Sequence, residues 1–97
     1  MPSENPKIVT DAALVPVSYA QLTSLGSAVG APFQNSRVAL IQCLGQNVRW
    51  RDDGTAPTTS AGMRLHAGET LQYNGDVSAI KFIEETAGAE LNITFYR

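Results

Sequence analysis

The residues best equipped for chemistry stand together in the run VRWRDDG at positions 48–54. Alternation along a strand predicts that Trp50 points into the core, while Arg49 and Arg51 on either side of it point outward. Guanidinium groups pair bidentately with carboxylates, and arginine is enriched at the hot spots of protein interfaces. The run is therefore the centre of a candidate contact surface, whose residues are Arg49, Arg51, Arg64, Asp52 and Asp53.

An ordinary structural role competes with this interpretation. The same arginines can pair across strands with acidic neighbours such as Asp53 or Glu69, and exposed pairs of this kind contribute about 0.2–1 kcal/mol. Asp52 and Asp53 stand before Gly54, where carboxylates also serve calcium sites, but the rest of a calcium loop is absent. We interpret the two aspartates as turn residues that accept hydrogen bonds from their own backbone.

The residue types that usually carry catalysis are sparse and scattered. The single histidine, His66, lies in a turn within LHAG, whereas a catalytic histidine needs a nucleophile and an orienting carboxylate beside it. The single cysteine, Cys43, lies in the apolar run 38–44, which predicts a buried thiol. The eight glycines are dispersed among turns and form no phosphate-binding loop. We therefore predict no enzymatic activity, no metal site and no cofactor.

Length and charge narrow the function further. The chain has 97 residues, of which 43% are hydrophobic and 16% are charged, and this composition suits one compact domain. A net charge of -2 lacks the basic patch of a nucleic-acid-binding protein. No apolar stretch approaches the roughly 20 residues that span a bilayer, and the first residues lack the layout of a signal peptide. We expect neither nucleic acid nor a membrane as a partner, and a chain that stays in the cytoplasm where it is made.

The first 13 residues differ in composition from the rest of the chain. Pro2 and Pro6 disfavour helix, and the small polar residues around them leave little apolar area to bury. We predict an extended N-terminal arm over residues 1–13, followed by a single domain over residues 14–97. Such an arm either docks on a neighbouring molecule or frays, and the sequence favours neither. The candidate contact residues of the arm are Pro6, Ile8 and Val9.

Short alternating strands, separated by glycine turns, fill the remainder. The pattern predicts strands over residues 15–19, 38–44, 48–51, 63–65, 71–73, 77–83 and 91–96. About seven or eight such strands without a long helix indicate an all-β fold, an antiparallel β-sandwich or jelly roll, with a small closed barrel as the alternative. Alternation leaves the polar residues on wet outer faces. The predicted core residues are Trp50, Leu65, Leu71, Phe82, Leu91, Ile93 and Phe95.

The second half of the chain resembles a known group of proteins. The run VRWRDDGTAPTTSAGMRLHAGETLQY, followed by GDVSAIKFI and by AGAELNITFYR, resembles small virion proteins of tailed bacteriophages. The resemblance covers Gly45 to Arg97. Such proteins are β-sandwich modules that decorate or cement the outside of a capsid, or that lie along the neck and tail. The resemblance assigns no residue to a catalytic or ligand site.

A structural function in the virion is what this resemblance implies. We expect a protein that binds the outside of the head and links neighbouring capsid subunits, with the major capsid protein or other virion proteins as partners. Copies are expected to associate as dimers or trimers at symmetry positions of the shell. A head–tail connector, neck or tail protein is one alternative. A carbohydrate- or receptor-binding module is another, with Tyr19, Tyr73 and Tyr96 as its candidate ligand contacts.

Overall fold

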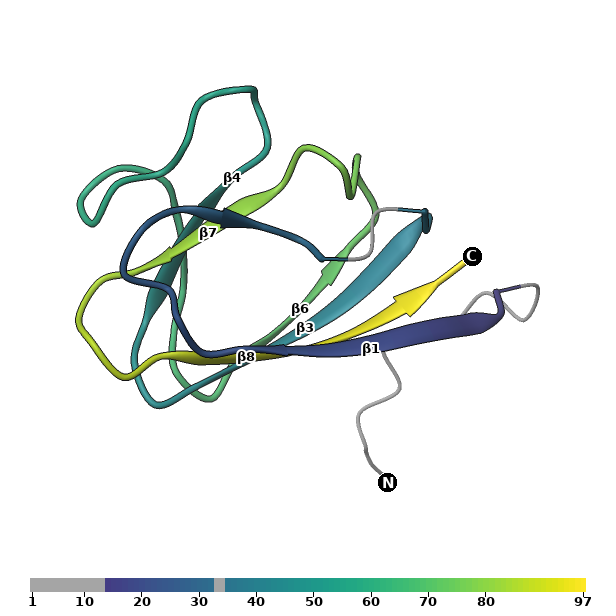
Figure 1. The fold of residues 1–97 in the computed structure, drawn as a ribbon, viewed down its shortest axis with the longest axis horizontal. Coiled ribbons are helices and arrows are strands. Elements are labelled where there is room, and N and C mark those ends of the chain that lie inside the picture. Colours follow the sequence, from purple (N-terminus) through teal and green to yellow (C-terminus); the bar gives the residue numbers. More distant parts are fainter. Residues whose placement is uncertain (1–13, 33–34) are drawn as a thin grey trace.

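The computed structural model describes residues 14–32 and 35–97 (Figure 1). These residues form eight strands and no helix. The strands are β1 Pro16–Leu22, β2 Val29–Gly30, β3 Val38–Leu44, β4 Val48–Arg51, β5 Met63–Leu65, β6 Thr70–Tyr73, β7 Lys81–Glu84 and β8 Glu90–Tyr96. The predicted arm over residues 1–13, with Pro6, Ile8 and Val9, lies outside the described residues.

The described strands form two antiparallel sheets of four strands each. Sheet A has the order β1-β8-β3-β6 and sheet B has the order β2-β7-β4-β5. Each strand of the first half pairs with its counterpart in the second half, namely β1 with β8, β2 with β7, β3 with β6 and β4 with β5. This nested pairing arises when one long hairpin folds into two layers, and it is the topology of a jelly roll. The predicted sandwich or jelly roll is confirmed, and the closed barrel is wrong.

The core lies between the sheets and follows the alternation of the strands. Leu91, Ile93 and Phe95 of β8 are fully buried, while the residues between them are half-buried. Phe82 of β7 and Leu65 of β5 belong to the same buried cluster from sheet B. The apolar residues of both inner faces therefore supply the hydrophobic burial that stabilises the fold.

The segment between β1 and β2 closes one side of the sandwich. β1 continues to Leu22, three residues beyond the strand that the sequence predicts. The chain then crosses from the edge of sheet A to the edge of sheet B (Figure 1). Leu25 is fully buried in this crossing, and its carbonyl oxygen accepts a hydrogen bond from the Glu84 amide at 2.9 Å. The irregular segment between β1 and β2 thus covers part of the core.

The strand predicted over residues 77–83 is shorter than expected. β7 begins only at Lys81, because Asp76 organises the preceding residues into a turn. The Asp76 carboxylate accepts a hydrogen bond from the Ser78 amide at 3.0 Å, and its carbonyl oxygen accepts one from the Ala79 amide at 2.9 Å. Ile80 is buried all the same, so this side chain reaches the core from a turn.

The opposite side of the sandwich, between the edge strands β5 and β6, is more open. Trp50 and Leu71 are half-buried and pack against the core cluster, not inside it. Met63, which pairs with Trp50 across β4 and β5, is 61% exposed. The expectation that the core encloses Trp50 is corrected on this point, because β4 is followed only by the edge strand β5 and the indole reaches the rim.

Two glycine turns abut at one end of the jelly roll. Gly45 follows β3 with a φ of +84°, in the left-handed region, and a Cβ at this position would collide with the carbonyl oxygen of Gly88. Gly68 has a similar φ of +91°, but a Cβ there would meet nothing within 4 Å. Gly45 and Gly68 therefore share a left-handed backbone conformation, but only Gly45 lies close to another backbone segment.

Gly45→Ala should lower the free energy of unfolding by more than Gly68→Ala does. Both variants incur the left-handed penalty of about 1–2 kcal/mol for a residue with a Cβ. At Gly45 the neighbouring turn must move as well, which adds a second cost of similar order. Chemical denaturation of the two variants measures the difference. Equal losses at the two positions would contradict the close approach of the turns.

Candidate functional site

One carboxylate joins two arginines on the outer face of sheet B. Arg49 and Arg64 stand directly opposite each other on β4 and β5, where like charges repel. Glu85, just after β7, accepts a hydrogen bond from the Nε atom of each arginine at 2.7 Å. Arg64 first, and Arg49 after it, hold the pKa of the Glu85 carboxyl below its ordinary value. The side chains of Arg49 and Glu85 are 19% and 16% exposed, so this pair is largely shielded from solvent.

The other candidate contact residues lie at the end of β4. Arg51 forms a bidentate pair with Asp53, with 3.0 Å from Nε to Oδ1 and 2.5 Å from Nη2 to Oδ2. The hydrogen bond from Arg51 lowers the pKa of Asp53. Asp53 also accepts a hydrogen bond from the Thr55 amide at 3.3 Å, as the turn interpretation expects. Asp52 accepts a hydrogen bond from the Tyr73 hydroxyl at 2.7 Å instead.

The five candidate contact residues therefore fall into two groups. Arg49 and Arg64 share the outer face of sheet B, whereas Arg51 ends β4 and Asp52 and Asp53 follow it. Each of the five has a partner within the chain. The partner that joins the first group, Glu85, lies in a turn, where alternation does not predict the direction of a side chain, so the sequence did not single it out. A contact role for the five residues stays a prediction.

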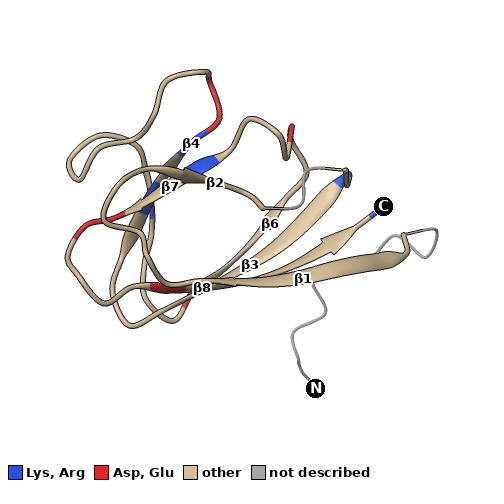
Figure 2. Ribbon diagram, in the orientation of Figure 1, with Lys and Arg blue, Asp and Glu red and all other residues tan. Residues whose placement is uncertain are grey.

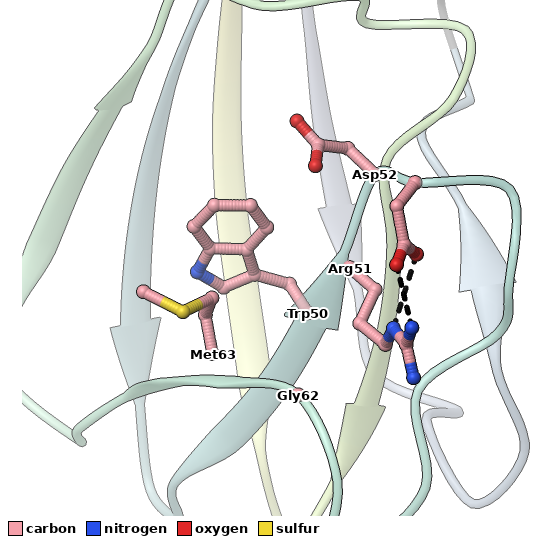
Figure 3. Close-up of a pocket in the computed structure, with 6 residues that line it drawn as sticks. Trp50, Arg51, Asp52, Gly62 and Met63 are labelled. Atoms are coloured by element: carbon pink, nitrogen blue, oxygen red, sulfur yellow. Dashed lines mark hydrogen bonds and ion pairs between the residues drawn. The ribbon is translucent and has the colours of Figure 1, made fainter.

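Two hollows share Trp50 and Met63 as walls. The first has a volume of about 410 Å³ and is lined by Trp50, Arg51, Asp52, Asp53, Gly62 and Met63 (Figure 3). The second, of about 390 Å³, extends toward β6 and is lined by Trp50, Met63, Arg64, Leu65, Glu69, Thr70 and Leu71. The Trp50 ring makes an edge-to-face contact with Tyr73, with the ring centroids 5.9 Å apart. The indole is thus anchored on one side and open on the other.

The three tyrosines that suggested a ligand site do not share one surface. Tyr73 is only 5% exposed, and burial together with the nearby Asp52 carboxylate raises the pKa of its hydroxyl. Tyr19 is 61% exposed on β1, and Tyr96 is half-buried on the neighbouring strand β8. Tyr73 therefore acts within the structure, as a hydrogen-bond donor to Asp52, and is not available beside the other two.

The outer face of sheet A is almost free of charge. Among the described residues that alternation places on it, Glu90 at one end is the single charged side chain. The basic residues Arg49, Arg51, Arg64 and Lys81 lie on sheet B, and Figure 2 shows blue on β4 and β7. The strands β1, β3 and β6 are tan along their lengths, and Arg37 before β3 and Arg97 after β8 lie beyond the strand ends. We call this surface the uncharged face, and its uncharged residues are Tyr19, Gln21, Leu40, Gln42, Leu44, Thr70, Gln72, Asn92, Thr94 and Tyr96.

Hydrogen bonds between side chains organise the uncharged face. The Tyr19 hydroxyl donates to Asn92 Oδ1 at 2.7 Å, and Asn92 Nδ2 donates to Gln42 Oε1 at 3.1 Å. This chain of contacts crosses β1, β8 and β3. Alternation predicted polar outward positions on every strand, but it does not say which strands share a sheet, so the segregation of charge onto sheet B was missed.

The remaining reactive groups are isolated from one another. His66 is exposed, with its Nδ1 atom 3.2 Å from Glu69 Oε1. Cys43 is buried, its Sγ atom lies 3.1 Å from the Gln46 carbonyl oxygen, and burial raises the pKa of the thiol. Within residues 14–32 and 35–97, no group of three or more His, Cys, Asp or Glu residues is placed to hold a metal ion. The same residues include no helix long and apolar enough to cross a membrane.

Comparison with known proteins identifies no relative, because no family model, curated protein or solved structure matches this chain. The function is therefore inferred from four features of the molecule itself. These are the jelly-roll topology, the ion pairs of sheet B, the Trp50 hollows and the uncharged face.

Glu85→Gln should destabilise the protein at pH 7 and remove part of its sensitivity to acid. The pKa of Glu85 is lowered in the folded protein, so its ion pairs stabilise the fold above the unfolded pKa of about 4.3. This contribution is lost as the pH falls through the lower, folded pKa. The urea midpoints of the variant and the parent should therefore differ most at neutral pH and converge in acid.

Glu90→Gln is the matched control, because Glu90 contacts the neutral amide of Gln21 and not an arginine. Its urea midpoint should stay parallel to that of the parent across the same pH range. A difference between Glu85→Gln and the parent that is constant with pH would contradict the stabilising role of the ionised Glu85.

Proposed function

We propose that this chain is a non-enzymatic structural protein of a tailed-bacteriophage virion, and specifically a decoration or cement protein on the outside of the head. The uncharged face is the observation that carries this proposal. Interface cores are depleted of charged residues and enriched in tyrosine relative to the rest of a protein surface. The face offers Tyr19, Tyr96 and Leu40 among amides and hydroxyls, on a broad sheet. It fits a flat protein partner better than a small ligand.

The distribution of charge indicates which sheet contacts the capsid. The arginines of sheet B are already paired with Glu85 and Asp53, so docking through that sheet would have to break or desolvate these pairs. Docking through sheet A desolvates neutral side chains that are already hydrogen-bonded to one another. The uncharged face is therefore the contact with the capsid, and sheet B faces outward.

The fold and the size of the chain agree with this role. Jelly rolls occur in viral capsid proteins as well as in lectins, so the fold is compatible with this role by analogy. A domain of 97 residues buries only about 60–65% of its unfolded surface, so association with a partner adds useful burial. The resemblance of residues 45–97 to small phage virion proteins points to the same class.

The partners follow from the same proposal. They are the major capsid protein or other virion proteins, and copies of the chain gather as dimers or trimers at symmetry positions of the shell. Nucleic acid and membranes are not partners, and the protein resides in the virion after synthesis in the host cytoplasm. A place at the connector, neck or tail would use the uncharged face in the same way and differ only in the protein that it meets.

Thr94→Lys should reduce binding to phage particles at least tenfold while the fold persists. Thr94 is half-buried at the centre of the uncharged face, opposite Leu40 on one side and Tyr19 on the other. A lysine there places an unpaired charge in the contact, which costs at least about 1.4 kcal/mol, a factor of ten. Co-sedimentation with particles that lack the protein measures binding, and thermal unfolding reports the fold.

Thr86→Lys adds the same charge in the exposed loop between β7 and β8 and is the matched control. It should bind particles as the parent does. If the two variants bind equally well, the uncharged face is not the contact. If the parent itself does not bind particles that lack it, the decoration proposal is wrong.

Deletion of residues 1–13 tests the predicted arm, with its candidate contacts Pro6, Ile8 and Val9. Particle binding should fall, because an arm that crosses onto a neighbour contributes contacts to the assembly. The midpoint of thermal unfolding should not change, since the predicted domain over residues 14–97 contains all eight described strands. Unchanged binding by the shortened protein would show that residues 1–13 do not contact the partner.

A further inference from the structure

The rim of the sandwich at Trp50 has features that the proposed capsid contact does not use. Trp50 is the single tryptophan of the chain, and it is half-buried beside Met63, which is 61% exposed. Figure 3 shows the indole between Met63 and the Asp52 carboxylate, at the hollow of about 410 Å³. Hollows of this size lie within the range of small-molecule sites, which combine an apolar floor with a few placed polar groups.

Tyr73 holds the indole and the carboxylate at this hollow in place. The Tyr73 hydroxyl lies 2.7 Å from Asp52 Oδ2, and the ring of Tyr73 supports the Trp50 indole edge-to-face. The Tyr73 hydroxyl stays protonated, so it donates to Asp52 and orients that carboxylate. One residue therefore positions both the aromatic floor and the acidic rim of the hollow.

Two polar atoms at the rim are left available to a ligand. Asp52 is exposed, and its second carboxylate oxygen, Oδ1, has no hydrogen-bond partner among the described residues. The indole Nε1 is likewise without a partner in that part of the chain, and it is not among the buried unsatisfied atoms, so it reaches solvent. Arg51 and Asp53, on the remaining side, neutralise each other as a bidentate pair.

We propose that this hollow is a binding site for a neutral saccharide. A pyranose ring has an apolar C–H face that packs on an indole, and hydroxyl groups around its edge that both donate and accept hydrogen bonds. Asp52 accepts from one hydroxyl, and the indole Nε1 donates to another. The uncompensated carboxylate of Asp52 repels anions, and the chain offers no metal cluster here among its described residues, so neither a phosphorylated ligand nor a divalent cation fits.

This site is separate from the capsid contact and does not depend on it. The hollow is built from β4 and β5 of sheet B, whereas the uncharged face belongs to sheet A. It also replaces the tyrosine-based site that the sequence suggested, because Tyr73 serves here from within the structure and not as a ligand contact.

Fluorescence of Trp50 tests the site directly, because no other tryptophan contributes to the signal. The full-length protein is titrated with maltotriose, cellotriose and N,N′,N″-triacetylchitotriose. At least one of them should produce a saturable change in emission, with a Kd on the order of 1 mM or tighter. No saturable change with any of the three overturns the proposal. A response to the apolar dye ANS without a response to the sugars identifies an apolar docking surface instead and also overturns it.

Asp52→Asn should weaken the binding of the responding sugar about five- to tenfold, because a charge-assisted acceptor is replaced by a neutral amide. The amide oxygen still accepts from the Tyr73 hydroxyl, so the floor of the hollow is kept. Glu90→Gln removes the same charge on sheet A, away from the hollow, and should leave the affinity unchanged. Equal affinities for Asp52→Asn and the parent would show that the sugar binds elsewhere, and shifts of the Gly62 and Met63 amides in ¹⁵N NMR give the independent check.

Discussion

The pairing of β3 with β8 is the constraint on which the rest of the structure depends. All seven residues of β3 pair with β8, from Val38 opposite Tyr96 to Leu44 opposite Glu90. This ladder joins segments about fifty residues apart in the sequence, so forming it costs loop-closure entropy. That cost is offset only when the strands between the two segments are also paired. The inward side chains of β3 and β8 form the centre of the core, and their outward side chains form the middle of the uncharged face.

Segregation of charge between the two sheets gives the jelly roll two different surfaces. Sheet B brings Arg49 and Arg64 together and needs Glu85 to compensate their repulsion. Sheet A carries a chain of neutral hydrogen bonds through Tyr19 and Asn92. Because the same two-layer fold carries both, one face is suited to a protein partner while the rim of the other sheet keeps Trp50 open to solvent.

Local pattern predicted much of this structure, and it was wrong where tertiary context decides. Strict alternation located β8 and its buried residues, because period two is unambiguous over seven residues. The start of β7 was misplaced, since the turn around Asp76 competes with strand. Trp50 was expected inside the core because alternation gives the direction of a side chain but not the presence of a covering strand. The uncharged face and the role of Glu85 require knowledge of which strands are neighbours.

Cryo-electron microscopy of phage particles to which this protein has been added is the most direct test of the proposed role. We expect density of the size of one jelly roll on the outside of the shell, with sheet A against the capsid and the Arg49–Glu85 side toward solvent. Density that meets the shell through sheet B, or virions that carry no such density anywhere, would contradict it. Density at the neck or tail would retain a structural role and replace the capsid as the partner.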